Sequence, residues 1–280
     1  FRFRSIEMHT FSVEGKKISK EINHQAIIKN MSMNLPNNSI ILIEGKNGSG
    51  KSVTLKMLAN IMKPSSGLMS VKGNISYAPD HLPMTINLTV KEYLDFIDSI
   101  SIKNQSDIKI SQLTHLFNLE PFLQKRIYEC SKGTQQKVNL IQCLIKKADI
   151  YIMDEPFSGL DKNAIAELKS LLIQFKQFAT IVLTSHEQIV DFTFVTHRYN
   201  IEQNHLIDNS STNADMKMLI KIIQVSEKEL SIILKEHDFQ MSKDGSIIVN
   251  SSQSNQVIAL LIHNGYFIEE VRRYTKNGVN

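Results

Sequence analysis

The chain has 280 residues, of which 42% are apolar and 21% charged, with 32 Lys and Arg against 28 Asp and Glu. This length suits two domains of about 100–200 residues each, and the apolar fraction excludes a disordered or fibrous chain. The formal charge of +4 is small and its basic residues are scattered, so we expect no nucleic-acid partner.

Up to about residue 207, short apolar runs alternate with longer segments of helical periodicity. The runs 40–43, 150–153 and 181–183 are rich in β-branched residues and have the length of buried strands. Helical spacing follows the first run up to Pro64, which we expect to end that helix. The alternation predicts an α/β domain over residues 1–207, with a parallel sheet covered by helices.

Residues 82–147 differ from the rest of this domain, because they have helical periodicity and no convincing strand. We interpret them as a helical subdomain inserted into the α/β domain. Cys130 and Cys143 are the two cysteines. With no His pair near them, they are expected to be ordinary thiols rather than metal ligands.

A polar stretch at 208–215 is predicted to be a linker. After it the pattern restarts, and a small α+β domain is expected over 216–280. Its predicted elements are a strand (218–225), a helix (227–236), a hairpin (239–250), a helix (255–263) and a strand (266–272). No apolar stretch approaches 18 residues, so we expect no membrane-spanning helix.

The strongest motif lies directly after the first buried run and before a helix. It matches G-x-x-x-x-G-K-[ST], a loop whose backbone N–H groups surround phosphate oxygens at the start of a helix. Lys51 would reach the β- and γ-phosphates, and the Ser52 hydroxyl would ligate Mg²⁺. The candidate nucleotide-binding residues are Gly45, Lys46, Asn47, Gly48, Ser49, Gly50, Lys51 and Ser52.

A second motif is the apolar run 150–153, which ends in Asp154 and Glu155. Ligands of parallel sheets collect at the carboxyl ends of the strands, which is where these two acids are expected. Asp154 would hold Mg²⁺ through its water shell, and Glu155 would orient or polarise the attacking water.

Three further segments carry a family resemblance. The run Asp154-Glu155-Pro156-Phe157-Ser158-Gly159-Leu160-Asp161 resembles the joined Walker B motif and D-loop of ATP-binding cassette (ABC) proteins. Residues 130–137 resemble the signature motif of that family, and residues 184–187 resemble its switch-histidine segment. The motifs occur in the family's order over roughly residues 15–207, so the chain is identified as a member of the ABC family.

The resemblance implies a P-loop NTPase fold, with a RecA-like parallel sheet and a helical subdomain. It implies hydrolysis of ATP with Mg²⁺, with Glu155 and His186 as the catalytic residues. Two such subunits, forming a homo- or heterodimer, would enclose two nucleotides head to tail. Ser131 and Gly133 of one subunit would close over the γ-phosphate held by Lys51 of the other. The same resemblance adds Asp161 to the nucleotide site.

The family also implies a separate transmembrane permease and a peripheral location at the cytoplasmic face of the membrane. Two departures suggest a branch. Lys132 replaces a usual Gly, as in exporters of the bacterial ABC-2 class, and Asp80 stands where a glutamine usually senses Mg²⁺. An acid there resembles exporters involved in lantibiotic immunity, so we expect export of amphipathic or antimicrobial peptides and count Asp80 as a metal-site residue. The segment 80–89 is the expected dock for the permease.

Two points stay open at this stage. The position expected to stack on adenine falls on Ile22, which is not aromatic, so His24 or Phe11 would have to replace it. The alternative function is a non-transport ABC ATPase acting on ribosomes or DNA. Such proteins usually carry two cassettes or a long coiled coil, whereas only 80 residues (131 − 51) separate Lys51 from Ser131 here.

Overall fold

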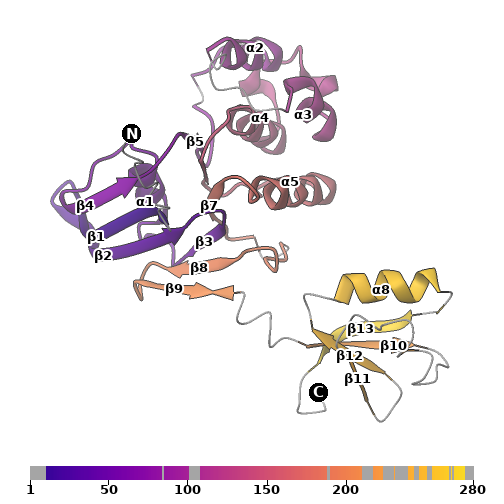
Figure 1. The fold of residues 1–280 in the computed structure, drawn as a ribbon. Coiled ribbons are helices and arrows are strands. Elements are labelled where there is room, and N and C mark those ends of the chain that lie inside the picture. Colours follow the sequence, from indigo (N-terminus) through magenta and orange to yellow (C-terminus); the bar gives the residue numbers. More distant parts are fainter. Residues whose placement is uncertain are drawn as a thin grey trace, which may run out of the picture. The chain divides into compact units, whose positions relative to one another are not determined.

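A computed structural model describes residues 11–83, 85–100, 108–187, 190–209, 217–222, 230, 239–242, 246–250, 254–264, 266 and 268–274. The chain divides into two compact units, Phe1–Ile207 and Asp208–Asn280. Each unit has its own sheet and core, and each is described separately below (Figure 1).

The first unit is built on a six-stranded sheet. Parallel pairing joins β5 to β6, β6 to β7, β7 to β3 and β3 to β8. The strands, in spatial order, are β5 (Ile75–Ala78), β6 (Ile150–Met153), β7 (Thr180–Thr184), β3 (Ile40–Glu44), β8 (His197–Asn200) and β9 (His205–Asp208). Every residue of β6 and β7 is buried. The α/β fold and the strands predicted at 40–43, 150–153 and 181–183 are therefore confirmed.

A second, antiparallel sheet was not anticipated from the sequence. Its order is β2 (Gln25–Pro36), β1 (Phe11–Ile22) and β4 (Ser66–Val71). Part of β2 buries alternate residues, as an amphipathic strand should. The pairing of β1 with β2, however, shifts register at several points between Phe11 and Glu21. These irregularities interrupt the period of two that reveals a strand in a sequence.

Helix α1 (Lys51–Leu58) follows β3 but ends earlier than predicted. Asn60 adopts a left-handed conformation with φ of 58°. Its N–H donates to the carbonyl of Met57, and the N–H of Ile61 donates to that of Lys56. This pair of hydrogen bonds closes a helix at a left-handed residue. The prediction that Pro64 ends the helix was therefore wrong.

The region predicted to be a helical subdomain is helical in the structure. It contains α2 (Val90–Ile100), α3 (Ile110–Leu116) and α4 (Lys132–Leu144), with short 3₁₀ turns at Glu120–Phe122 and Ile127–Glu129. These helices gather apart from the antiparallel sheet (Figure 1). Helix α5 (Lys162–Phe175) connects β6 to β7. Cys130 and Cys143 are buried free thiols.

The second unit contains an antiparallel sheet in the order β11-β12-β10-β13 and one described helix. Its elements are β10 (Lys217–Ile222), β11 (Phe239–Met241), β12 (Ile247–Asn250), α8 (Ser254–His263) and β13 (Ile268–Tyr274). The predicted helix 227–236 lies outside the described residues except for Leu230, as does most of the predicted linker. Among the described helices, none combines the length and apolar character needed to cross a bilayer.

Candidate functional site

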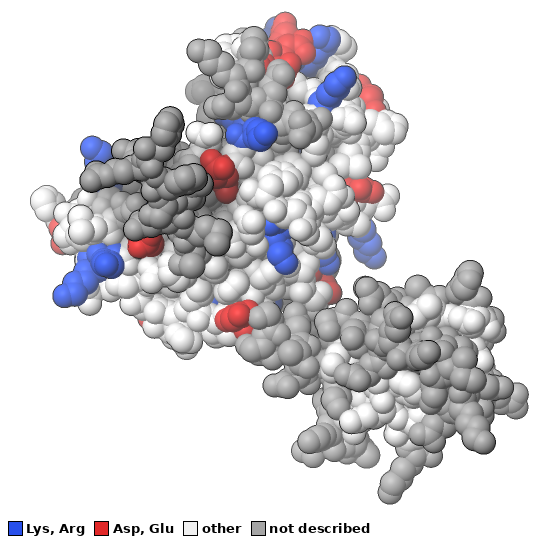
Figure 2. Space-filling model, in the orientation of Figure 1, with Lys and Arg blue, Asp and Glu red and all other residues white. Residues whose placement is uncertain are grey.

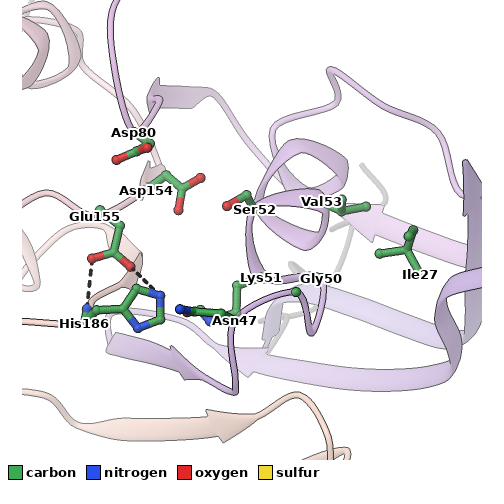
Figure 3. A pocket seen from close by; sticks show the side chains of 11 residues that line it. Ile27, Asn47, Gly50, Lys51, Ser52, Val53, Asp80, Asp154, Glu155 and His186 are labelled. Atoms are coloured by element: carbon green, nitrogen blue, oxygen red, sulfur yellow. Dashed lines mark hydrogen bonds and ion pairs between the residues drawn. The ribbon is translucent and has the colours of Figure 1, made fainter.

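The carboxyl edge of the parallel sheet opens into a cavity of about 460 Å³. Figure 3 shows that its walls come from the loop before α1, from the ends of β5 and β6, and from the segment after β7. The lining residues are Ile27, Asn47, Gly48, Gly50, Lys51, Ser52, Val53, Asp80, Asp154, Glu155 and His186.

The loop between β3 and α1 is shaped to expose backbone N–H groups. Gly48 and Gly50 have φ of 80° and 94°, values that residues with a Cβ adopt only under strain. Gly50 leads directly into α1, so the partial positive charge of the helix start faces the cavity. The Lys51 ammonium donates to the carbonyls of Gly45 (2.7 Å) and Lys46 (2.9 Å). The loop is therefore a cationic cradle suited to phosphate oxygens.

Asp154 and Glu155 directly follow β6, and both are hydrogen-bonded to Thr184 of β7. Asp154 is 3% exposed, and its Oδ1 accepts a hydrogen bond from the Thr184 hydroxyl at 2.7 Å. The same hydroxyl oxygen accepts the N–H of Glu155 at 3.0 Å. Thr184 thus fixes both acids through one side chain. The motif 184–187 predicted no role for Thr184, because its two hydrogen bonds join residues 29 and 30 positions apart in the sequence.

Glu155 and His186 form a hydrogen-bonded pair at the cavity wall (Figure 3). One carboxylate oxygen of Glu155 accepts the backbone N–H of His186 at 2.9 Å, and the other lies 3.3 Å from the ring Nε2. Burial raises the pKa of Glu155, with the nearby charges of Asp154 and Asp80 adding to the effect and His186 opposing it. A partly buried carboxylate with a raised pKa, facing the cavity, is suited to accept a proton from water.

Three oxygen ligands face the same space. Ser52, Asp154 and Asp80 all line the cavity, and Figure 3 shows the Ser52 hydroxyl directed towards the Asp154 carboxylate. Mg²⁺ prefers oxygen ligands, and it is usually held by one or two carboxylates together with water and substrate phosphates. Among the described residues, no three His, Cys, Asp or Glu side chains come together as a metal site. The donor set therefore fits an ion completed by a phosphate rather than one enclosed by protein.

Ser131, Gly133 and Asp161 do not line this cavity. Ser131 is the N-cap of α4, and its hydroxyl accepts the N–H of Thr134 at 3.2 Å, as its position before the apolar face predicts. Asp161 caps α5 and pairs with Lys137 at 2.8 Å, which lowers its pKa. The structure therefore separates these three residues from Lys51 of the same chain.

Gly133 lies against the D-loop. A methyl group in place of its hydrogen would stand 2.3 Å from the carbonyl oxygen of Gly159. The Lys132 ammonium also donates to the Ser158 hydroxyl at 2.9 Å. The start of α4 and the D-loop are thus in direct contact, with no room for a side chain at Gly133.

The expected base-stacking residues are not at the cavity. Phe11 lines a different cavity, together with Lys72, Asp149 and Thr180. Ile22 and His24 are not among the lining residues either. The lining of this cavity gives no support to Phe11 or His24, and base stacking by either residue stays a prediction. The apolar contacts of the cavity come instead from Ile27 on β2 and from Val53 on α1.

Comparisons with known proteins agree with this geometry. A family model described as "ABC transporter" matches residues 28–158. A Bacillus subtilis protein named "Uncharacterized ABC transporter ATP-binding protein YxlF" is 30% identical over 190 residues, which are 63% of this chain and 64% of that protein, slightly under two thirds of its length.

The "Zinc import ATP-binding protein ZnuC" of Pasteurella multocida is 32% identical over 182 residues, covering 62% of this chain and 67% of that protein. Among solved structures, the "dimeric structure of a post-hydrolysis state of the ATP-binding cassette MJ0796 bound to ADP and Pi" superposes with a TM-score of 0.61 at 19% identity. It covers 70% of this chain and 98% of that one. At that identity the likeness concerns the fold.

Proposed function

The chain belongs to the family of ABC transporter ATP-binding proteins, as an ATPase subunit, and we propose that it hydrolyses ATP to drive a transmembrane permease that is a separate chain. The observation that carries the proposal is the convergence of Lys51, Ser52, Asp154, Glu155 and His186 on one cavity. We propose that the first unit performs this reaction at the cytoplasmic face of a membrane.

The residues of the cavity divide the work of phosphoryl transfer. The loop amides and the Lys51 ammonium bind the β- and γ-phosphates and stabilise the negative charge that develops during cleavage. Ser52, Asp154 and Asp80 would hold Mg²⁺, which would supply positive charge to offset part of that negative charge. Ile27 provides apolar contact beside the loop.

Glu155 accepts a proton from the attacking water. Its pKa is raised by burial, so it is a stronger base than an exposed glutamate. His186 holds the carboxylate through its backbone N–H. The half-exposed imidazole, 51% accessible, remains able to contact a γ-phosphate while lying 3.3 Å from Glu155.

Each cavity is completed by a second subunit in this proposal. Ser131 and Gly133 stand at an exposed helix start, where a hydroxyl and backbone N–H groups can bind an anion. Neither residue lines the cavity of its own chain, which supports a contact with a nucleotide held by a partner. That partner is either a second copy of this chain or a related subunit.

The test is the trapping of an ATP-bound dimer. Glu155→Gln removes the proton acceptor but leaves the phosphate loop intact, so ATP should convert the purified variant from monomer to stable dimer on size-exclusion chromatography. Glu155→Gln combined with Lys51→Ala is the matched control and should stay monomeric. Rapid hydrolysis by Glu155→Gln would remove Glu155 from its assigned role.

For the direction of transport we propose export of amphipathic or antimicrobial peptides. The support is the resemblance carried by Lys132 and Asp80, whereas one of the similar proteins bears the name of a zinc importer. Asp80 lines the cavity and begins the segment proposed to contact the permease. The alternative of a ribosome- or DNA-acting ATPase is not favoured. On the face drawn in Figure 2, described Lys and Arg residues are interspersed with acids rather than massed.

The export proposal is tested in vesicles containing the membrane protein that co-purifies with this chain. Peptide should accumulate inside vesicles whose ATPase side faces outward, and Asp80→Ala should weaken the stimulation of ATP hydrolysis by peptide. Unchanged transport and unchanged stimulation in Asp80→Ala would refute the role of this residue. Movement of Zn²⁺ in place of peptide would refute the substrate class.

A further inference from the structure

Helix α4 carries a row of three buried amide side chains that the proposed reaction does not yet use. Gln136, Asn139 and Gln142 are 4%, 0% and 8% exposed. They are three residues apart, so they follow one another along a single face of the helix. Asn139 Nδ2 lies 3.3 Å from the Gln136 amide oxygen, and Gln142 Nε2 lies 3.3 Å from the Asn139 amide oxygen. We call this row the amide ladder.

Each amide of the ladder also donates to a backbone carbonyl outside the helix. Gln142 donates to Tyr77 at 3.0 Å, and Asn139 donates to Pro79 at 2.5 Å. Gln136 donates to the carbonyl of Glu155 at 3.1 Å. Two of the three carbonyls therefore lie just before Asp80, and the third belongs to the proposed proton acceptor itself.

The topology explains why these carbonyls need side-chain partners. Among the described strands, β5 is at the edge of the sheet and has β6 as its only neighbour there. On the β6 side, the carbonyl of Ala78 accepts the N–H of Asp154 at 2.9 Å. Carbonyls alternate in direction along a strand, so those of Tyr77 and Pro79 point to the open side, where α4 packs. Buried carbonyls left without a donor would be costly.

The ladder joins two parts of the site that belong to different nucleotides in the proposed dimer. The start of α4 holds Ser131 and Gly133, proposed to contact the nucleotide of the partner. Asp80 and Glu155 face the nucleotide of the same chain. All three amides belong to one helix, so a shift of α4 would displace the donors of the Glu155, Pro79 and Tyr77 carbonyls together.

We propose that Gln136, Asn139 and Gln142 are positioning residues. They fix where Glu155 and the segment just before Asp80 lie relative to the start of α4. Closure of α4 on the nucleotide of the partner then sets the placement of the proton acceptor in its own cavity. This inference rests on the proposed function. It deepens that function by naming the residues through which one site controls hydrolysis in the other.

The test compares two substitutions at the contact between α4 and β5. Asn139→Leu keeps the approximate volume but removes the central amide, and with it the bonds to Pro79, Gln136 and Gln142. Ser76→Ala is the matched control. Its buried hydroxyl donates to the carbonyl of Cys143 at 2.7 Å, across the same contact but away from Asp80 and Glu155.

For Asn139→Leu we expect kcat for ATP hydrolysis to fall about 10- to 100-fold, the usual cost of a small misplacement of a reacting group. The KM for ATP and the dissociation constant for ADP should stay within about twofold of wild type, because the phosphate loop is untouched. Ser76→Ala should lose thermal stability but keep its kcat within about twofold. Gln136→Met, which removes the bonds to Glu155 and Asn139 but keeps those to Tyr77 and Pro79, serves as the second variant if Asn139→Leu does not fold.

Wild-type kcat in the folded ladder variant would overturn the inference. So would an equal loss of kcat in Ser76→Ala, because that result would assign the effect to general packing. Neither outcome touches the proposed function, which fails separately if the wild-type chain does not hydrolyse ATP or if Glu155→Gln forms no ATP-dependent dimer.

Discussion

Gly133→Ala is the sharpest perturbation of the contact between the start of α4 and the D-loop. The added methyl group would lie 2.3 Å from the carbonyl oxygen of Gly159. Carbon and oxygen atoms that are not bonded rarely approach closer than about 3.0 Å, so the two backbones must separate by about 0.7 Å (3.0 − 2.3). Neither atom belongs to a flexible side chain, so the strain cannot be relieved by a rotamer change.

The effect on stability combines two opposing contributions. Replacing glycine with alanine in a helix gains up to about 1 kcal/mol in intrinsic helix propensity. Overpacking a tight contact costs about 1–3 kcal/mol. The free energy of unfolding should therefore fall by about 0–2 kcal/mol, which leaves the variant folded. The effect on turnover should be larger, since a shift of this size at a reacting group costs about 10- to 100-fold.

The assay pairs steady-state ATP hydrolysis with urea unfolding. Gly15→Ala is the matched control, because its methyl group would lie 2.4 Å from Cδ1 of Ile18, the end of a side chain rather than a backbone atom. Gly15 lies in β1 and does not line the cavity. The control should hydrolyse ATP at the wild-type rate, and both variants should bind ADP normally.

A wild-type kcat in Gly133→Ala would refute the reasoning, because it would mean that the spacing of α4 and the D-loop does not affect hydrolysis. Weakened ADP binding in the same variant would also refute it, since Gly133 does not line the cavity of its own chain.

Three further predictions concern single side chains. Thr184→Val removes the hydroxyl that bridges Asp154 and Glu155 and should cost about 1–3 kcal/mol in urea unfolding together with most of the ATPase activity. Thr180→Val, at the other end of β7, should cost stability alone, and equal activity losses would contradict the bridging role. Glu155→Gln should raise the melting temperature more at about pH 8 than at about pH 5: the pKa of Glu155 is raised by burial, so the folded wild type loses stability as pH rises through that pKa. An increase in melting temperature that is the same at both pH values would contradict a raised pKa of Glu155. Asp161→Ala removes the N-cap of α5 and should lower the free energy of unfolding by about 1 kcal/mol, with an unchanged urea midpoint as the contradicting result.

Much of this protein could be predicted from contiguous residues. The loop 45–52 lies in a single run between a strand and a helix, so its spacing alone predicts the phosphate cradle that Lys51 completes. Ser131 precedes an apolar helical face, a position typical of an N-cap, and its hydroxyl accepts the N–H of Thr134 in that role. Such features depend on neighbours within about four residues, where backbone geometry fixes which groups meet.

The errors had equally local causes. Pro64 was expected to end α1, but the helix ends earlier, where Asn60 adopts a left-handed conformation. The spacing of apolar residues does not indicate this conformation. The antiparallel sheet was missed because the shifts of register in β1 interrupt the alternation of apolar residues.

What only the tertiary structure decided is how distant segments share one site. The sequence by itself determined the family motifs, the strands of the parallel sheet and the residues able to bind phosphate. It did not determine that Thr184 bridges both acids, that Gly133 touches Gly159, or that Asn139 reaches the carbonyl of Pro79 across 60 positions. Those contacts follow from the order of strands in the sheet and from the side on which α4 packs. Local periodicity predicts neither the strand order nor the side on which α4 packs. The spacing of side chains along a helix is the same whatever packs against it.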